Sequence, residues 1–595
     1  MIKSITTLLA TLALALPTQA DEGHTRGIGV YPGRPSESFE PTLVRDYTYR
    51  NVALHRMVYQ SSAADVNLTG QLITDGEVCT SEPCQVVVST PKGALDKRRR
   101  EKTIDGNPQS LINVEGQDTY LQLDWTWMTV AADELRLNAE AVYDAAQANA
   151  GYTIEVMASA DGKTWTSIGR EVGDGLPGVA TRQTMSSDPN KQESKIRLPL
   201  RKVQTTIPLS HVTPWAHLRV VFRMKGAAYW RVRQTDFYRK GVIQDALPSA
   251  HYTSAWASEG GGTQWVMVDL GTQVTANRVV INWIHPAQQG ELQVSDDGKE
   301  WRRVASLRRS KKLEQSLNCR FKARYVRLLM TRPDASGRYV LSELQVMGFG
   351  GLVARPHERM GMRYGRYYLN GGDWQLSRKG SDRSVLATVP ATVLQSYMNI
   401  GAVANTNYSD NMRAASESYF NADFTYRTSF DVPADYQGRH VYLNFDGINW
   451  KATVKLNGQS LGRVEGAFKR GRFDVTRYLK ATGNQLEIAV ERPAHFGAVK
   501  IKNTESTDMN GGYLGADNPT FHASIGWDWI TTTPGREVGI WNDVYLTANG
   551  GVSLSDPMVD THLDLPDTLA TMTPSVWVAN DRDTTITATL SGWIG

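Results

Sequence analysis

The chain has 595 residues, 16 tryptophans and a formal net charge of +4. At roughly 100 to 200 residues a domain, this length predicts about three to five domains. Basic clusters at 97–100 and 308–312 lack regular aromatic neighbours, so we interpret them as solvated loops. The small charge and these clusters argue against a nucleic-acid partner.

The first residues have the pattern of a secretory signal peptide. Lys3 precedes an apolar run at 5–16, and Thr18 and Ala20 frame a cleavage point. This run is shorter than the roughly 20 apolar residues of a membrane-spanning helix, and no later stretch reaches that length. We therefore expect a signal peptide at 1–20, no membrane span, and a secreted or periplasmic location.

The chain contains only 3 cysteines, which are too few for a disulfide framework in an exported protein of this size. Cys79 and Cys84 could close one small loop. Cys319 lies beside a strand-like stretch and is expected to be a buried thiol. The fold must therefore depend on apolar cores.

From Tyr120 onward, apolar residues alternate with polar ones at period two, which is typical of half-buried antiparallel strands. Examples are the pairs or triplets Leu121 and Leu123, Ile154 and Val156, Leu218, Val220 and Phe222, Val441, Leu443 and Phe445, and Leu486, Ile488 and Val490. Long helical periodicity is nearly absent. The pattern predicts an all-β protein of tandem β-sandwich domains.

One five-residue pattern occurs twice. Ser159, Asp161, Gly162, Lys163 and Trp165 recur with the same spacing as Ser295, Asp297, Gly298, Lys299 and Trp301. An Asp-Gly pair supplies the positive φ of a tight hairpin turn, and the tryptophan is expected to return on the next strand and cover the core. Two related domains are therefore expected to follow one another.

These two copies resemble discoidin domains, also called coagulation-factor 5/8 type C domains, which include carbohydrate-binding modules of bacterial glycosidases. The second copy, at about 242–349, has the motifs Thr253-Ser254-Ala255-Trp256, Gln264-Trp265-Val266-Met267-Val268-Asp269-Leu270-Gly271, Arg324-Tyr325-Val326-Arg327-Leu328 and Ser342-Glu343-Leu344. The first copy, at about 45–240, has long insertions and a looser pattern, including Asn51-Val52-Ala53 and Asp105-Gly106-Asn107.

Many discoidin domains hold a structural calcium ion, and the resemblance implies Asp245, Thr253 and Glu343 as its ligands here. Oxygen ligands suit this hard cation. The alternative is that Asp245 caps a turn and Glu343 makes a salt bridge.

For sugar binding by this second copy, the candidates are polar and aromatic residues of its loops: His251, Trp283 and His285. Trp256 is a further aromatic candidate, but the family's Ser-Ala-Trp motif usually packs inside. We therefore expect Trp256 in the core.

A third domain, at about 369–549, contains an Asn457-Gly458 hairpin signal between strand-like runs. Its end is rich in tryptophan, with Gly526-Trp527-Asp528-Trp529 and Gly539-Ile540-Trp541-Asn542-Asp543-Val544. The region resembles the sugar-binding jelly-roll domain of glycoside hydrolase family 2. The Gly-Trp-Asp-Trp form is most similar to the exo-β-glucosaminidase and β-mannosidase branch, whereas Asn542 replaces the usual arginine.

In that family, this domain lends an acidic residue and an asparagine to the pocket of a neighbouring catalytic barrel. The resemblance implies Asp528 for the acid, with Trp527 and Trp529 as stacking surfaces. Asn405 and Asn407 are equal candidates for the asparagine. A turn aspartate satisfied by backbone amides is the alternative for Asp528.

Retaining family 2 enzymes hydrolyse glycosides with two carboxylates of a (β/α)8 barrel, the acid/base following an asparagine. This sequence has no Asn-Glu pair, and 551–595 is expected to be a truncated immunoglobulin-like domain. No catalytic residue is therefore assigned, and whether the chain acts as an enzyme stays open. It is expected to be the carbohydrate-binding portion of an exported β-glycosidase. The alternatives are a stand-alone glycan-binding or adhesion protein, and a β-galactoside as substrate.

Overall fold

The computed structural model describes residues 38–593 of the chain. Within that range it leaves out 65–66, 83–84, 96–101, 105–109, 127–128, 144–149, 175–180, 183–197, 211–213, 245, 247–252, 311, 410, 421, 493–534, 536 and 564–569. The predicted signal peptide lies outside the described residues. Nearly all regular structure is β-strand, which confirms the all-β prediction. Among the described helices, none is long and apolar enough to cross a bilayer.

The first sandwich, here called the composite sandwich, contains residues 42–74 and 256–355. Its two longest strands, β17 (Gln264–His285) and β20 (Glu314–Arg332), pair along most of their length. The remaining strands of the sheet are β2 (Arg50–Asn51), β3 (Met57–Gln60), β16 (Trp256–Ala257), β18 (Gln289–Ser295), β19 (Arg302–Arg308) and β21 (Val340–Phe349). β1 (Thr42–Asp46) pairs separately with β22 (Gly351–Arg355). The helical turn η1 (Gly70–Thr74) is fully buried.

Strand pairing divides the first half of the chain differently from the predicted domains 45–240 and 242–349. β2 pairs with β21, and β3 pairs with β17, so residues from the predicted first copy complete the second. Val52 donates its backbone N–H to Val346 over 2.8 Å and is fully buried. The boundary prediction was wrong because period two marks a strand without indicating its partner.

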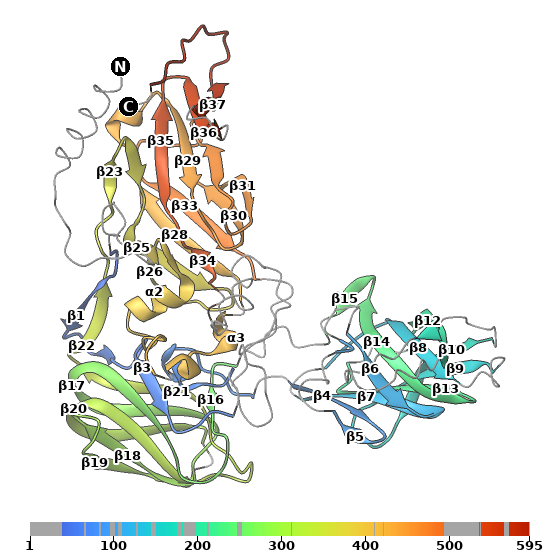
Figure 1. Ribbon diagram of the computed structural model, residues 1–595. Coiled ribbons are helices and arrows are strands. Elements are labelled where there is room, and N and C mark those ends of the chain that lie inside the picture. The colour runs from blue at the N-terminus through green and yellow to red at the C-terminus, as the bar shows by residue number, and fades with distance from the viewer. Residues whose placement is uncertain are drawn as a thin grey trace.

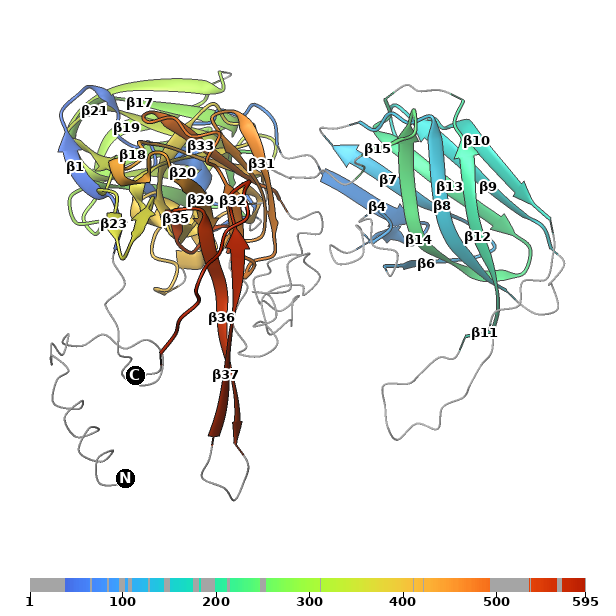
Figure 2. The same cartoon turned by 90° about the horizontal axis from the view of Figure 1, so that it is seen from above.

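The inserted sandwich, residues 85–244, interrupts the composite sandwich. One sheet has the order β10-β9-β13-β7-β4-β5 and the other β11-β12-β8-β14-β15, with β6 beside β14. The strands are β4 (Gln85–Thr90), β5 (Gly93–Ala94), β6 (Ile112–Glu115), β7 (Asp118–Thr126), β8 (Glu134–Tyr143), β9 (Tyr152–Ser159), β10 (Thr166–Gly173), β11 (Thr181–Arg182), β12 (Leu198–Pro208), β13 (His217–Met224), β14 (Ala227–Arg239) and β15 (Val242–Gln244). Figures 1 and 2 both show it as a separate body with its own core.

The predicted internal repeat is confirmed at the level of single hydrogen bonds. Asp161 Oδ1 accepts the backbone N–H groups of Lys163 and Thr164, each over 2.8 Å. Asp297 Oδ1 accepts those of Lys299 and Glu300 over 2.8 and 2.9 Å. These bonds lower the pKa of each aspartate to about 2.

The tryptophans that follow these turns do not cover the cores, contrary to the prediction. Trp165 and Trp301 are partly exposed. The guanidinium Cζ of Arg219 lies 4.2 Å from the Trp165 ring centroid, and that of Arg327 lies 3.8 Å from the Trp301 centroid. Cation–π contact on the outer sheet face holds both rings there.

The third sandwich, residues 361–549, has two sheets of orders β23-β24-β35-β29-β32 and β26-β25-β28-β33-β30-β31. Their strands are β23 (Gly361–Arg363), β24 (Arg366–Tyr368), β25 (Gly371–Arg378), β26 (Ser384–Val389), β28 (Phe424–Phe430), β29 (His440–Phe445), β30 (Lys451–Leu456), β31 (Gln459–Glu465), β32 (Gly471–Asp474), β33 (Asn484–Val490) and β35 (Val544–Asn549). Asn457 and Gly458 have φ angles of +51° and +82°, as the predicted hairpin requires. Helices α2 (Val393–Asn399) and α3 (Glu417–Phe420) lie between β26 and β28.

The composite and third sandwiches share a buried seam. Leu72 of η1 belongs to the apolar core of the third sandwich. Thr69 Oγ1 donates a hydrogen bond to the carbonyl of Ala414 over 2.6 Å, and Ser416 Oγ donates to the carbonyl of Asn67 over 3.1 Å. Figure 1 shows α2 and α3 between the two bodies. The segment 393–420 therefore depends on both sandwiches for its position.

The last described region is a hairpin of β36 (Val552–Leu563) and β37 (Ala570–Asn580), which projects from the third sandwich in Figure 2. Many of its apolar side chains are exposed, Trp577 at 74%. Residues 584–590, which follow this hairpin, have no regular structure. An isolated pair of strands offers them no layer against which to pack.

Two cysteines fall within the described residues. Cys79 has a free thiol, and Cys84 lies outside the described residues, so their predicted bridge stays untested. Cys319 is buried and donates to the carbonyl of Leu317 over 3.5 Å, as the sequence predicts.

Candidate carbohydrate and cation sites

The predicted sugar-binding residues Trp527, Asp528 and Trp529 lie outside the described residues. The chain is described again from Gly535, whose Cα lies against α2. A Cβ at this glycine would approach Leu394 Cβ to 2.6 Å, so only glycine fits. Val393 then donates its backbone N–H to the carbonyl of Val538 over 2.7 Å. The segment that follows the Trp-rich motif is thus fixed to the first turn of α2.

The loop with the two candidate asparagines begins directly after α2. Asn405 Oδ1 accepts the backbone N–H of Asn407 over 3.0 Å, so the Asn405 side chain holds a turn. The Asn407 side chain is exposed and makes no hydrogen bond with the described residues. Tyr408 is 72% exposed beside it. The geometry therefore separates two residues that the sequence left equal, and leaves the Asn407 amide available.

Glu343 of β21 is the best-defined candidate cation ligand. Its side chain is fully buried, and its Oε1 atom has no hydrogen-bond partner among the described residues. Among the described residues, Oε2 accepts a hydrogen bond only from the backbone N–H of Gly76, over 3.3 Å. Burial, with the nearby Asp75 carboxylate as a second cause, raises the pKa of Glu343 well above its usual range. A bound cation would compensate this unpaired carboxylate.

The surroundings of Glu343 differ from the predicted ligand set. Thr253 is buried as expected, whereas Asp245 lies outside the described residues. Asp75, which the sequence reasoning missed, lies nearby and accepts a hydrogen bond from Ser254 Oγ over 2.6 Å. In the sequence, the Asp75-Gly76 dipeptide is the feature that could have indicated this carboxylate. Among the described residues, no group of three or more His, Cys, Asp or Glu side chains is arranged to hold a metal ion.

The predicted sugar contacts of the composite sandwich are largely inaccessible. Trp283 is 1% exposed because the alternation of β17 turns it inward, so its assignment to sugar stacking was wrong. His285 has both ring nitrogens within ion-pair distance of carboxylates, Nε2 at 2.7 Å from Glu82 and Nδ1 at 3.5 Å from Asp334. His251 lies outside the described residues. Trp256 is fully buried, as predicted.

Comparison with known proteins identifies two of these regions. A family model described as glycosyl hydrolase 2 galactose-binding domain-like matches residues 374–542. An F5/F8 type C model described as a NedA-like, galactose-binding domain matches 245–328. The resemblance of the second copy to discoidin domains and that of the third domain to the family 2 sugar-binding domain are thereby confirmed.

Individual relatives match about a third of the chain. An exo-β-D-glucosaminidase of Streptomyces avermitilis is 32% identical over 211 residues, 34% of this chain and 20% of that protein. A mannosylglycoprotein endo-β-mannosidase of Lilium longiflorum is 30% identical over 220 residues, 36% of this chain and 22% of that protein. The β-D-mannosidase structure from Dictyoglomus thermophilum is 22% identical with a TM-score of 0.29, covering 37% of this chain and 26% of that chain. The matched part thus spans about a fifth of these curated relatives.

Proposed function

We propose that this chain, which carries a glycosyl hydrolase 2 galactose-binding-like domain and an F5/F8 type C-like domain, is the carbohydrate-binding portion of an exported exo-β-glycosidase. The observation that carries the proposal is the match of 374–542 to the glycosyl hydrolase domain. The relatives named exo-β-D-glucosaminidase and mannosylglycoprotein endo-β-mannosidase indicate β-glucosaminides and β-mannosides as the substrate class. Export follows from the signal-peptide pattern of residues 1–20.

The third sandwich would contribute substrate contacts rather than the reaction itself. Asn407 lies exposed on the loop after α2, and Gly535 packs against Leu394 of the same helix. Asp528 is the acidic contact that the family resemblance implies. Hydrolysis with retention would use two carboxylates of a neighbouring barrel domain.

The composite sandwich would hold a structural calcium ion. Glu343 Oε1 is buried without a partner among the described residues, and the Asp75 carboxylate lies nearby. Thr253, which is also buried, is a further ligand that the discoidin resemblance implies. Such an ion would neutralise the buried carboxylates and stabilise the loops that flank the inserted sandwich.

The proposal is tested with the purified chain alone and with the chain joined to a family 2 barrel. We expect hydrolysis of chromogenic β-glucosaminides or β-mannosides only from the joined protein. Binding of glycans by the chain alone, without turnover after joining, would favour a stand-alone glycan-binding protein. Preference for a β-galactoside would reject the substrate class.

A further inference from the structure

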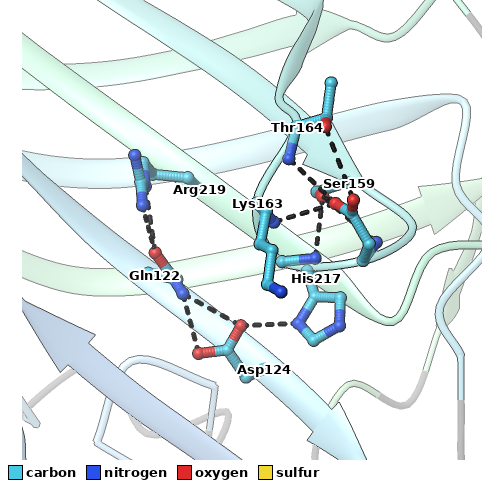
Figure 3. A network of polar contacts seen from close by, with 9 residues as sticks. Gln122, Asp124, Ser159, Lys163, Thr164, His217 and Arg219 are labelled. Atoms are coloured by element: carbon cyan, nitrogen blue, oxygen red, sulfur yellow. Dashed lines mark hydrogen bonds and ion pairs between the residues drawn. The ribbon is translucent and has the colours of Figure 1, made fainter.

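The outer face of one sheet of the inserted sandwich carries a connected row of polar and aromatic side chains. In β7 and β13, the residues that point away from the core alternate with buried Leu121, Leu123 and Leu218. The outward residues that matter here are Tyr120, Gln122, Asp124, His217 and Arg219. Figure 3 shows how four of them meet beside the 159–164 turn.

Hydrogen bonds fix this row in one arrangement. Arg219 donates from Nε and Nη2 to Gln122 Oε1 over 3.0 and 2.5 Å. Gln122 Nε2 donates to both oxygens of Asp124 over 3.0 and 2.9 Å. His217 Nδ1 lies 2.7 Å from Asp124 Oδ1. A ligand would therefore meet side chains whose conformational entropy has already been lost on folding.

Two aromatic rings flank the guanidinium of Arg219. Its Cζ lies 4.1 Å from the Tyr120 ring centroid and 4.2 Å from that of Trp165. Stacking keeps the guanidinium in place while its Nη1 makes no hydrogen bond with the described residues. The His217 Nε2 atom likewise has no partner among them, and the imidazole is 25% exposed.

The composite sandwich provides an internal reference for this face. Because Ser159 and Ser295 are equivalent, the strand registers align Arg219 with Arg327 and His217 with Tyr325. Arg327 also donates twice to a glutamine, Gln293, over 2.9 and 2.6 Å and covers a tryptophan. An Arg–Gln–Trp unit thus occurs in both sandwiches, with the glutamine on β7 in the inserted sandwich and on β18 in the composite sandwich.

What differs between the two faces is the aspartate. In the composite sandwich, Asp269 accepts hydrogen bonds from Nε and Nη2 of Arg324, each over 2.8 Å, and its side chain is 5% exposed. The aligned Asp124 has Ala216 in place of that arginine, pairs with His217 and is 27% exposed. Of the two sandwiches, therefore, only the inserted one has an accessible hydrogen-bond acceptor, Asp124, and an accessible imidazole, His217, at these aligned positions.

We propose that this outer face, centred on His217, Asp124 and Arg219, binds an uncharged glycan chain. Alternating donors and acceptors fit sugar hydroxyls, and the Trp165 and Tyr120 rings offer apolar surface. The opposite charges of Asp124 and Arg219 favour no net charge on the ligand. An open sheet face suits an extended chain rather than a single terminal sugar. The inference rests on the proposed function only in taking the ligand to be carbohydrate.

The test is affinity electrophoresis of the full chain in gels that contain galactomannan, chitosan or polygalacturonate. We expect galactomannan to retard the wild-type chain, and Arg219→Ala and His217→Ala to weaken the apparent affinity at least about tenfold. Arg327→Ala is the matched control, since it breaks the same Arg–Gln–Trp unit in the composite sandwich. It should lower the melting temperature as much as Arg219→Ala without weakening binding.

Three outcomes would overturn this site. If the wild-type chain is retarded and both His217→Ala and Arg219→Ala are retarded equally, the glycan binds elsewhere and only the proposed function stands. Retardation by chitosan or polygalacturonate alone would show a charged ligand. A wild-type chain that migrates freely in all three gels would reject both proposals.

Discussion

Arg56 of the composite sandwich donates a hydrogen bond from Nη2 to the carbonyl of Ile400 over 2.8 Å, across 344 residues of sequence. The Arg56 side chain is buried, which lowers its pKa to about 10, and Ile400 directly follows α2. This contact joins a discoidin-like domain to the loop that carries Asn405 and Asn407. The two domains are therefore expected to unfold together rather than as units on a linker.

Replacing Arg56 tests that coupling. Arg56→Ala leaves the Ile400 carbonyl without its donor and opens a cavity, which should lower the free energy of unfolding by about 2 to 4 kcal/mol. Hydrogen exchange at 400–416 should accelerate in parallel. Arg45→Ala is the control, because the exposed Arg45 side chain bonds Thr272 within the composite sandwich. Unchanged exchange in Arg56→Ala would show that the seam does not order this loop.

Calcium should stabilise the chain through Glu343. An ion bound only by the folded state raises stability in proportion to RT ln(1 + [L]/Kd), so chelation should lower the melting temperature. Glu343→Gln should melt at the same temperature with and without EDTA, and higher than the chelated wild type, since it removes a buried charge. Glu291→Gln, at a partly exposed position in β18, should keep the calcium response. If EDTA leaves the melting temperature of the wild type unchanged, the chain binds no stabilising calcium ion at Glu343.

Substitutions of Asn405 and Asn407 should have different effects when the chain is joined to a family 2 barrel. Asn407→Ala should lower kcat/KM about tenfold, because a direct hydrogen bond to substrate is lost, with little change in melting temperature. Asn405→Ala should instead loosen the turn that it holds and lower the melting temperature. Equal kinetic losses in both variants, with equal destabilisation, would argue for a loop effect alone.

Asp528→Ala in the same joined enzyme tests the acidic contact implied by the family resemblance. Charge-assisted hydrogen bonds to sugar hydroxyls are worth roughly 1.5 to 3 kcal/mol, so kcat/KM should fall about ten- to a hundredfold. The thermal stability should be retained. Full activity with a lowered melting temperature would identify Asp528 as a turn residue.

The repeated turns predict a specific pH dependence. Each aspartate has a folded pKa of about 2, below its ordinary value of 3.8, so its contribution is present above about pH 4 and lost as the pH falls through 2. Asp161→Ala and Asp297→Ala should therefore melt below the wild type at pH 7. The difference should disappear near pH 2. A gap that persists at low pH would show that the turn is stabilised by something other than the ionised carboxylate.

Local features of the fold follow from the sequence because their causes are local. The paired Asp-Gly turns form as predicted, since each aspartate bonds backbone groups two and three residues away. The alternation of apolar residues likewise predicts the all-β class. The discoidin resemblance, through its Ser-Ala-Trp motif, predicts the buried position of Trp256. The family resemblances depend on such short motifs and are confirmed for the same reason.

The tertiary structure alone decides which segments belong together. Val58 of β3 pairs with Val268 of β17, although the inserted sandwich lies between them in the sequence. The period-two pattern of either strand does not indicate its partner. The same long-range packing buries Trp283, brings Asp75 to Glu343, and leaves Asp124 open where Asp269 is covered by Arg324. Accessibility and charge pairing are properties of the packed sheets, and these decide which residues are available to a ligand.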